Sequence, residues 1–159
     1  MTNQTYYHIS NRRLRNGVQL TSGVYGERVQ RPDFIEKNYS KHIQENIFEQ
    51  IRKSEAPELP SRLNCIFLFP ELTIAKAYHA TKHKYEAFVY EVEIAEGTPY
   101  VFDMDLLTCE GLSFQQITTF AKAYWAQKKH QESQTLEVLL DGVAIVKNVV
   151  LQPSDIWDL

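Results

Sequence analysis

Cysteine is scarce in this chain, which has two, Cys65 and Cys109, among 159 residues. Two thiols without a Cys-x-x-Cys spacing are too few for the disulfide scaffold that stabilises many small secreted proteins. We therefore expect both thiols to be reduced and to form part of the interior.

Long apolar runs are also missing. No stretch approaches the roughly 20 apolar residues that a membrane span needs, and the opening "MTNQTYYHIS" has no apolar segment of a cleaved signal peptide. We expect no membrane partner, and a protein that is cytoplasmic or is delivered into a target cell without a classical signal peptide.

A strong excess of charge of one sign is absent as well. The formal net charge is −3, and the 43% hydrophobic and 23% charged residues are ordinary for a globular protein. This balance argues against a general binder of nucleic acids or membrane surfaces. The local exception is "NRRLR" at residues 11–15, which reads either as a solvated loop or as a substrate contact.

Several catalytic signatures are missing. No glycine-rich phosphate loop follows a strand, and no Gly-x-Ser-x-Gly elbow occurs. His79 and His83 are four residues apart on an expected helix, which is compatible with a metal pair. Without a His-Glu-x-x-His pattern or an evident third ligand, surface histidines are the better interpretation, and a metal-dependent hydrolase stays a distant alternative.

Alternating and helical patterns predict one α+β domain over residues 1–159. Residues 11–39 form a long irregular connection, of the kind that is often functional. Ser113 and Gln116 fit a helix capping box, and Ile43, Ile47 and Ile51 form an apolar helical stripe. The helix that begins at the capping box has its own expected core stripe: Phe114, Ile117, Ala121, Tyr124 and Trp125. The expected strands are 5–10, 63–69, 85–94 and 100–104, and the expected helices are 40–55, 70–83 and 113–129.

The segment "TLEVLLDGVAIVKNVVL", residues 135–151, is typical of a β-hairpin. Asp141-Gly142 is a strong signal for its two-residue turn, which places Leu140 opposite Val143. Both faces of that hairpin are apolar, except that Glu137 lies in the middle of one. A carboxylate among apolar neighbours is unfavourable unless it is paired, so Glu137 is a candidate functional residue. The alternative is that its face is less covered than the pattern suggests.

Two further residues carry chemistry. His8 shares a strand face with Ser10, and the two can jointly bind a polar ligand edge, although a half-buried structural histidine is the simpler interpretation. Tyr78 lies near the end of the expected helix 70–83, where its ring is either ordinary core or a stacking face for a planar, cationic ligand.

His8, Tyr78 and Glu137 in this order resemble the His-Tyr-Glu branch of the mono-ADP-ribosyltransferase superfamily, which includes diphtheria-toxin and PARP-like enzymes. The segment "CIFLFPELTIAKAYH" (65–79) is similar to the central PARP-type run. In that register Phe67 falls on the strand tyrosine of the family and Tyr78 on the helix tyrosine. Two positions depart from the pattern: Ile9 replaces a glycine, and Phe67 lacks a hydroxyl.

The resemblance is closest to small bacterial domains that share "PSR" before the central strand and "YW…EVL" near the end. Here these are residues 60–62 and the stretch from Tyr124-Trp125 to Glu137. The resemblance implies a split β-sandwich with flanking helices, which binds NAD⁺ between two small sheets and breaks its nicotinamide–ribose bond.

The resemblance also implies a role for each matched residue. Glu137 would bind the ribose 2′-hydroxyl and stabilise the developing positive charge. His8 would hydrogen-bond the nicotinamide ribose, and Tyr78 would stack on nicotinamide. The remaining implied NAD⁺ contacts are Ser10, Arg62 and Phe67.

These expectations describe an NAD⁺-dependent transferase that acts on a protein or nucleic-acid acceptor, as a bacterial toxin or effector with an antitoxin or immunity partner. Two alternatives stay open. One is an NAD⁺ glycohydrolase, in which water is the acceptor. The other is an inactive module of the same fold that binds a nucleotide or a protein.

Overall fold

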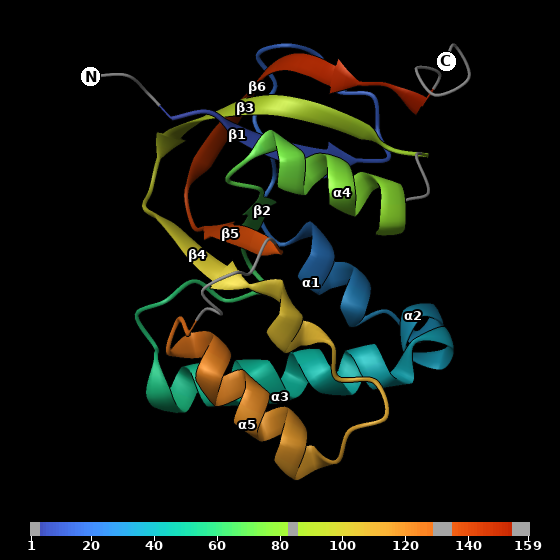
Figure 1. Cartoon of the computed structure of the whole chain (residues 1–159), viewed down its shortest axis with the longest axis vertical. Coiled ribbons are helices and arrows are strands. Elements are labelled where there is room, and N and C mark those ends of the chain that lie inside the picture. Colours follow the sequence, from blue (N-terminus) through green and yellow to red (C-terminus); the bar gives the residue numbers. More distant parts are fainter. Residues whose placement is uncertain (1–3, 83–85, 129–134, 154–159) are drawn as a thin grey trace.

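The computed structural model describes residues 4–82, 86–128 and 135–153, which form two antiparallel sheets and several helices (Figure 1). The fold is therefore α+β, as the sequence predicts. In the first sheet the order is β1 (Tyr6–Ser10), β3 (Phe88–Glu96), β6 (Val143–Leu151). In the second sheet it is β2 (Ile66–Leu68), β5 (Leu136–Leu140), β4 (Pro99–Asp103).

The three helices expected from periodicity are present. Ser113 caps α5 as predicted, because its hydroxyl accepts from the Gln116 amide while the Gln116 side chain accepts from the Ser113 amide. The expected irregular connection 11–39 instead contains two short helices, whose few residues give little periodic pattern. The helices are α1 (Val24–Val29), α2 (Pro32–Lys37), α3 (Tyr39–Glu55), α4 (Leu72–Lys82), the 3₁₀ helix η1 (Met104–Leu107) and α5 (Phe114–Trp125).

The predicted hairpin at 135–151 is wrong. Both strands form, but β5 pairs with β2 and β4 in the second sheet, whereas β6 pairs with β3 in the first. Leu140 therefore lies opposite Ile66 and Pro99, and not opposite Val143. The Asp141-Gly142 pair carries the chain from one sheet to the other.

Gly142 is required there by close backbone approach and not by a hairpin turn. A Cβ at this position would lie 2.0 Å from the Glu96 carbonyl oxygen. Its neighbour Gly97, in the β3–β4 connection, has φ +100°. A Cβ at Gly97 would likewise collide with the Asp141 carbonyl oxygen. The two connections between the sheets thus pass each other in direct contact.

The core has three parts. One lies between the facing sheets, where Tyr90 and Val92 of the first meet Val138 and Leu140 of the second. A second lies under α3 and α5, and a third packs α4 against the other face of the first sheet. Both cysteines are free and buried, as expected.

Two apolar stripes differ from the sequence prediction. In α3 the buried residues are Gln44, Glu45 and Phe48, whereas the three isoleucines are only half-buried. The helix is rotated relative to the predicted stripe because Glu45 is drawn inward by a charged partner. In α5, Phe114 is 68% exposed, while the rest of the predicted stripe is buried. Among the described residues, no helix is long and apolar enough to cross a membrane.

Candidate functional site

Glu137 lies in β5 opposite Phe102 of β4, and it is only 6% exposed. Strand alternation turns Val138 and Leu140 toward the first sheet and leaves Glu137 and Leu139 facing α3 and α5. The sequence prediction of a carboxylate on a covered face is therefore confirmed.

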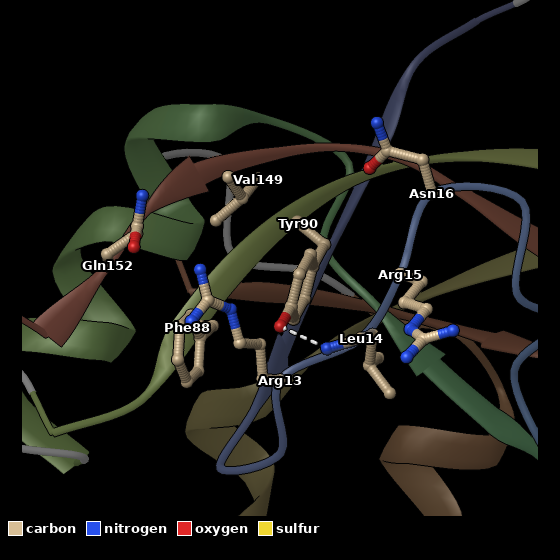
Figure 2. A pocket seen from close by; sticks show the side chains of 8 residues that line it. All are labelled: Arg13, Leu14, Arg15, Asn16, Phe88, Tyr90, Val149 and Gln152. Carbon is tan, nitrogen blue, oxygen red and sulfur yellow. Dashed lines mark hydrogen bonds between the residues drawn. The ribbon is translucent and has the colours of Figure 1, made fainter.

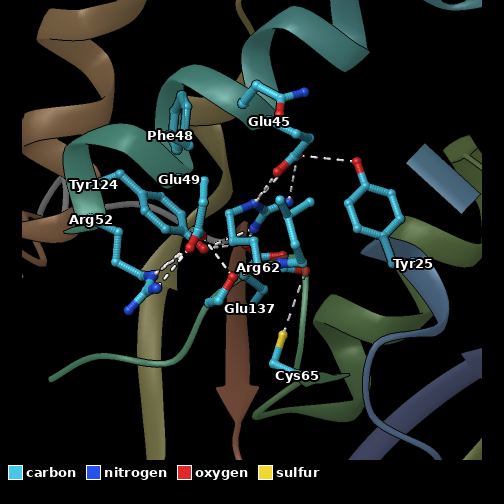
Figure 3. A network of polar contacts seen from close by, with 12 residues as sticks. Tyr25, Glu45, Phe48, Glu49, Arg52, Arg62, Cys65, Tyr124 and Glu137 are labelled. Carbon is cyan, nitrogen blue, oxygen red and sulfur yellow. Dashed lines mark hydrogen bonds and ion pairs between the residues drawn. The ribbon is translucent and has the colours of Figure 1, made fainter. Parts of the chain in front are cut away.

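Arg62, in the segment before β2, is the charged partner of Glu137 (Figure 3). Its guanidinium donates through Nη1 to Glu137 Oε1 and, at 2.8 Å, to the Tyr124 hydroxyl. Through Nε it also pairs with Glu45 Oε2 at 2.9 Å. The Tyr124 hydroxyl in turn donates to Glu137 Oε1 at 2.7 Å. We call these four residues, Glu45, Arg62, Tyr124 and Glu137, the Glu137 cluster.

Aromatic rings enclose the guanidinium of this cluster. The Arg62 Cζ atom lies 5.1 Å from the centre of the Phe67 ring and 5.4 Å from that of Tyr124, which are cation–π distances. Burial alone lowers the pKa of Arg62, but the carboxylates of Glu137 and Glu45 outweigh it and raise that pKa well above its usual value. Arg62 is therefore a permanent cation that fixes both carboxylates.

The formal charges of the Glu137 cluster do not cancel. Two carboxylates face one guanidinium, which leaves an excess of one negative charge in a place shielded from water. Lys41 of α3 lies within electrostatic range, where burial lowers the pKa of its ammonium against the opposing pull of Glu45 and Glu137, and it offsets the surplus wherever it is protonated. A buried site with surplus negative charge favours a cation or a group that becomes positive during reaction.

His8 is half-buried in β1, and its ring reaches the second sheet. Nδ1 lies 2.8 Å from the Phe67 carbonyl oxygen, which can only accept, so Nδ1 carries the proton. Burial lowers the pKa of His8 and outweighs that hydrogen bond. The imidazole is therefore neutral at pH 7, and Nε2 is an acceptor for a hydroxyl group.

Tyr78 is half-buried on α4, with its ring tilted against Phe69 at a centroid distance of 5.1 Å. Burial raises its pKa, and the negative charge of Glu137 raises it further. The Tyr78 hydroxyl thus lies within electrostatic range of Glu137. Ser10, at the end of β1, accepts from the Arg12 amide at 3.1 Å.

The predicted site residues are thus brought together to different degrees. Arg62, Phe67 and Glu137 are in direct contact, and His8 joins them through the Phe67 carbonyl. Tyr78 of α4 lies in the same apolar cluster as Leu136 of β5 and within electrostatic range of Glu137, whereas Ser10 bonds within its own loop.

Sequence reasoning missed Glu45 and Tyr25, which complete the enclosure of Arg62. Tyr25 of α1 donates to Glu45 Oε1 at 3.0 Å and sets its ring edge against Phe67 at 5.3 Å. Gly26 lets α1 approach closely, because a Cβ there would lie 1.9 Å from the Leu63 carbonyl oxygen. No local pattern marks either residue, since their partners are distant in sequence.

Only His79 of the histidine pair lies in the part of the chain that is described. His83 lies outside the described residues. His79 is buried and not on the surface, contrary to the prediction, and its Nε2 lies 2.6 Å from the Ala87 carbonyl oxygen. Residues 4–82, 86–128 and 135–153 contain no group of three or more His, Cys, Asp or Glu residues that could hold a metal ion.

Fold and cluster together define an α+β protein that holds a paired carboxylate beneath two helices. The chain belongs to the family described as "Protein of unknown function (DUF2441)", whose model matches residues 3–152. No curated protein matches the chain.

Proposed function

We propose that this chain is an NAD⁺-dependent mono-ADP-ribosyltransferase, which breaks the nicotinamide–ribose bond and transfers ADP-ribose to a macromolecular acceptor. The observation that carries the proposal is the Glu137 carboxylate, held rigidly in a cluster with one surplus negative charge. The resemblance of the His8, Tyr78 and Glu137 motifs to the superfamily supplies the reaction.

The architecture is compatible with the split β-sandwich that this superfamily uses. Two small sheets face each other; His8 lies on the first, and Glu137 lies on the second with its side chain turned toward α3 and α5. Phe67 joins them, because its carbonyl bonds His8 while its ring packs on Arg62.

Cleavage of the nicotinamide–ribose bond is accelerated by negative charge close to the sugar. Cleavage of a glycosidic bond passes through an oxocarbenium-like transition state, in which positive charge develops on the ribose. A fixed carboxylate in a water-poor site stabilises that charge without having to reorganise. By comparison with a single lost oxyanion-hole donor, removal of Glu137 raises the barrier by about 3–4 kcal/mol.

The other residues then bind and orient the substrate. The neutral His8 presents Nε2 as an acceptor for a ribose hydroxyl, and Tyr78 stacks on nicotinamide to hold the leaving group in line. We assign Arg62 to positioning Glu137, and not to direct contact with NAD⁺, because its guanidinium already bonds Glu45, Tyr124 and Glu137.

Access to Glu137 requires α1 to move. Tyr25 covers Arg62 and Phe67 and is fastened to Glu45, and neither of the two surface hollows described for this chain is lined by Glu137. In this proposal α1 is displaced when NAD⁺ binds, and its return excludes water from the reacting sugar.

The decisive test compares Glu137→Gln with Glu45→Gln. Each variant takes one carboxylate from Arg62 and keeps the shape of the side chain, but only Glu137 is assigned to the ribose. Nicotinamide release from NAD⁺ by purified protein should fall about 100- to 1,000-fold in Glu137→Gln. It should fall by much less in Glu45→Gln, because Glu45 contacts Arg62 and not the ribose, with folding of both variants checked by circular dichroism.

Equal losses in the two variants would show that the cluster acts only through stability. If nicotinamide is released in cell extract but no macromolecule becomes linked to ADP-ribose, the glycohydrolase alternative, in which water accepts the ADP-ribose, is identified.

A second candidate has its own supporting observation. Glu137 is buried and already paired with Arg62 and Tyr124, and a purely structural ion pair has the same features. On this reading the chain is a binding module without catalysis. Wild-type protein would then release no nicotinamide, even with extract present as a source of acceptors.

A further inference from the structure

A second region of the molecule, away from the Glu137 cluster, has the properties of a ligand site (Figure 2). A groove of about 680 Å³ lies between the loop that follows β1 and the face of β3 and β6. Arg13, Leu14 and Arg15 line it from the loop, and Phe88, Tyr90 and Val149 line it from the strands. We call it the arginine groove.

The loop is held in place by the sheet beneath it. The buried Tyr90 hydroxyl accepts from the Leu14 amide at 2.7 Å and donates to the Arg12 carbonyl at 2.9 Å. The Gly17 amide bonds the Val146 carbonyl at 2.7 Å. The arginines are therefore carried by a backbone that is fixed at both ends, which lowers the entropy lost on binding a ligand.

The charge of the groove is unbalanced. Arg13 and Arg15 are exposed, and within the described part of the chain neither forms an ion pair. None of the residues described as lining the groove is acidic. In a chain with a net charge of −3, this local surplus of positive charge selects for an anion.

The floor of the groove is aromatic. Phe88 is half-buried and stacks on Tyr90 at a centroid distance of 5.9 Å with an interplanar angle of 19°. Val149 beside them is 42% exposed. Figure 2 shows Arg13 beside Phe88, with Arg15 on the other side of Leu14.

From these features we infer that the arginine groove binds single-stranded nucleic acid. Phosphates pair with Arg13 and Arg15, and an unpaired base stacks on the Phe88 ring, which is the combination that holds single strands without a sequence code. A duplex does not fit this chemistry, because its bases are already stacked and paired. The strand partners Ser10–Phe88 and His8–Tyr90 place the groove on the strand pair that carries His8. The further reading, that the bound strand is the ADP-ribose acceptor, rests on the proposed function.

The test measures binding alone, without NAD⁺, so that it is independent of the proposed reaction. Fluorescence anisotropy of labelled single strands of about 12 nucleotides, DNA and RNA in separate arms, gives the affinity over a series of salt concentrations. The Arg13→Ala/Arg15→Ala double variant should bind at least about tenfold more weakly, and the slope of log affinity against log salt should fall by about 1.4. Phe88→Leu should weaken binding by about five- to tenfold while leaving that slope unchanged.

A matched control removes the same charge elsewhere. Arg31→Ala/Lys53→Ala loses two exposed cations far from the groove in sequence, and its affinity should equal that of wild type. Equal losses in the two double variants would overturn the inference, as would tighter binding to duplex than to single strands. Direct binding of labelled adenosine monophosphate, with no binding of oligonucleotides, would identify a small-nucleotide site and also overturn the inference.

The two proposals fail separately. Glu137→Gln should bind the oligonucleotide as wild type does, because Glu137 does not line the groove. Loss of nicotinamide release with intact oligonucleotide binding therefore concerns only the reaction. Loss of oligonucleotide binding in the groove variants, with nicotinamide release unchanged, concerns only the groove.

Discussion

The two arginine-bearing regions differ in what surrounds the charge. In the Glu137 cluster the Arg62 side chain is 5% exposed, and its guanidinium donates hydrogen bonds to carboxylates and a phenol. In the arginine groove the guanidinium groups are exposed and unpaired within the described residues. Buried charges fix geometry and stability together, whereas exposed charges are available to a ligand, so the same substitution has different consequences in the two places.

The largest expected effect is on the buried side of this comparison. Arg62→Met keeps the length and apolar stem of the side chain but leaves Glu45 and Glu137 without a cation. A buried charge that loses its partner destabilises the fold by about 3–5 kcal/mol. Urea unfolding followed by tryptophan fluorescence measures this loss.

The control for that experiment is Arg31→Met, which breaks an exposed pair with Glu27 at 3.8 Å. Its free energy of unfolding should change by less than about 1 kcal/mol. A similar small change in Arg62→Met would mean that the cluster is wetter than its burial indicates.

A smaller effect should appear as a pH dependence of stability. Burial lowers the folded-state pKa of His8 below its ordinary value of 6.5, so the unfolded chain binds the proton more readily. The stability that this neutral histidine contributes is complete above about pH 6.5 and is lost as pH falls through the lowered pKa. His8→Gln should flatten that part of the curve, measured as the urea midpoint at successive pH values. An unchanged slope in the variant would assign the pH dependence to other groups.

The smallest expected effect is on the exposed side. Arg13→Ala/Arg15→Ala should change the free energy of unfolding by less than about 0.5 kcal/mol, because both side chains are exposed and lack partners in the described chain. The same denaturation measurement checks it. A loss of several kcal/mol would show that the two arginines contribute to the stability of the fold, and would remove the contrast with Arg62.

Local signals predicted local structure well. The Ser113 capping box and the strand around His8 depend on neighbours within a few residues, and both appear as expected. The apolar faces of the expected hairpin 135–151 predict Glu137 on a covered face, and that face is covered although the hairpin does not form. The partner of Glu137, Arg62, is 75 residues away, so the nature of the pairing had to come from the structure.

The failures have the same physical origin. Asp141-Gly142 is a turn signal read over two residues, but the partner of β6 is β3, roughly fifty residues earlier in the chain, and the turn signal yields to that pairing. The buried face of α3 was displaced from its isoleucines because Arg62 draws Glu45 inside. Long-range pairing of strands and charges therefore determines the strand partners and the buried helix face, which sequence periodicity alone does not.

The two inter-sheet connections contact each other at Gly97 and Gly142, and this contact restricts movement of one sheet relative to the other. Peptide backbones in contact there leave no room for one sheet to slide without carrying the other. The Tyr7–Phe69 bridge adds a second tie between the sheets. Both ties lie on the Glu96 side of Phe88 along β3, so relative movement of the sheets has its longest lever arm at the Phe88 end. The arginine groove lies at that end of β3, so a strand bound there would be more sensitive to displacement of one sheet against the other than a ligand bound near Gly97.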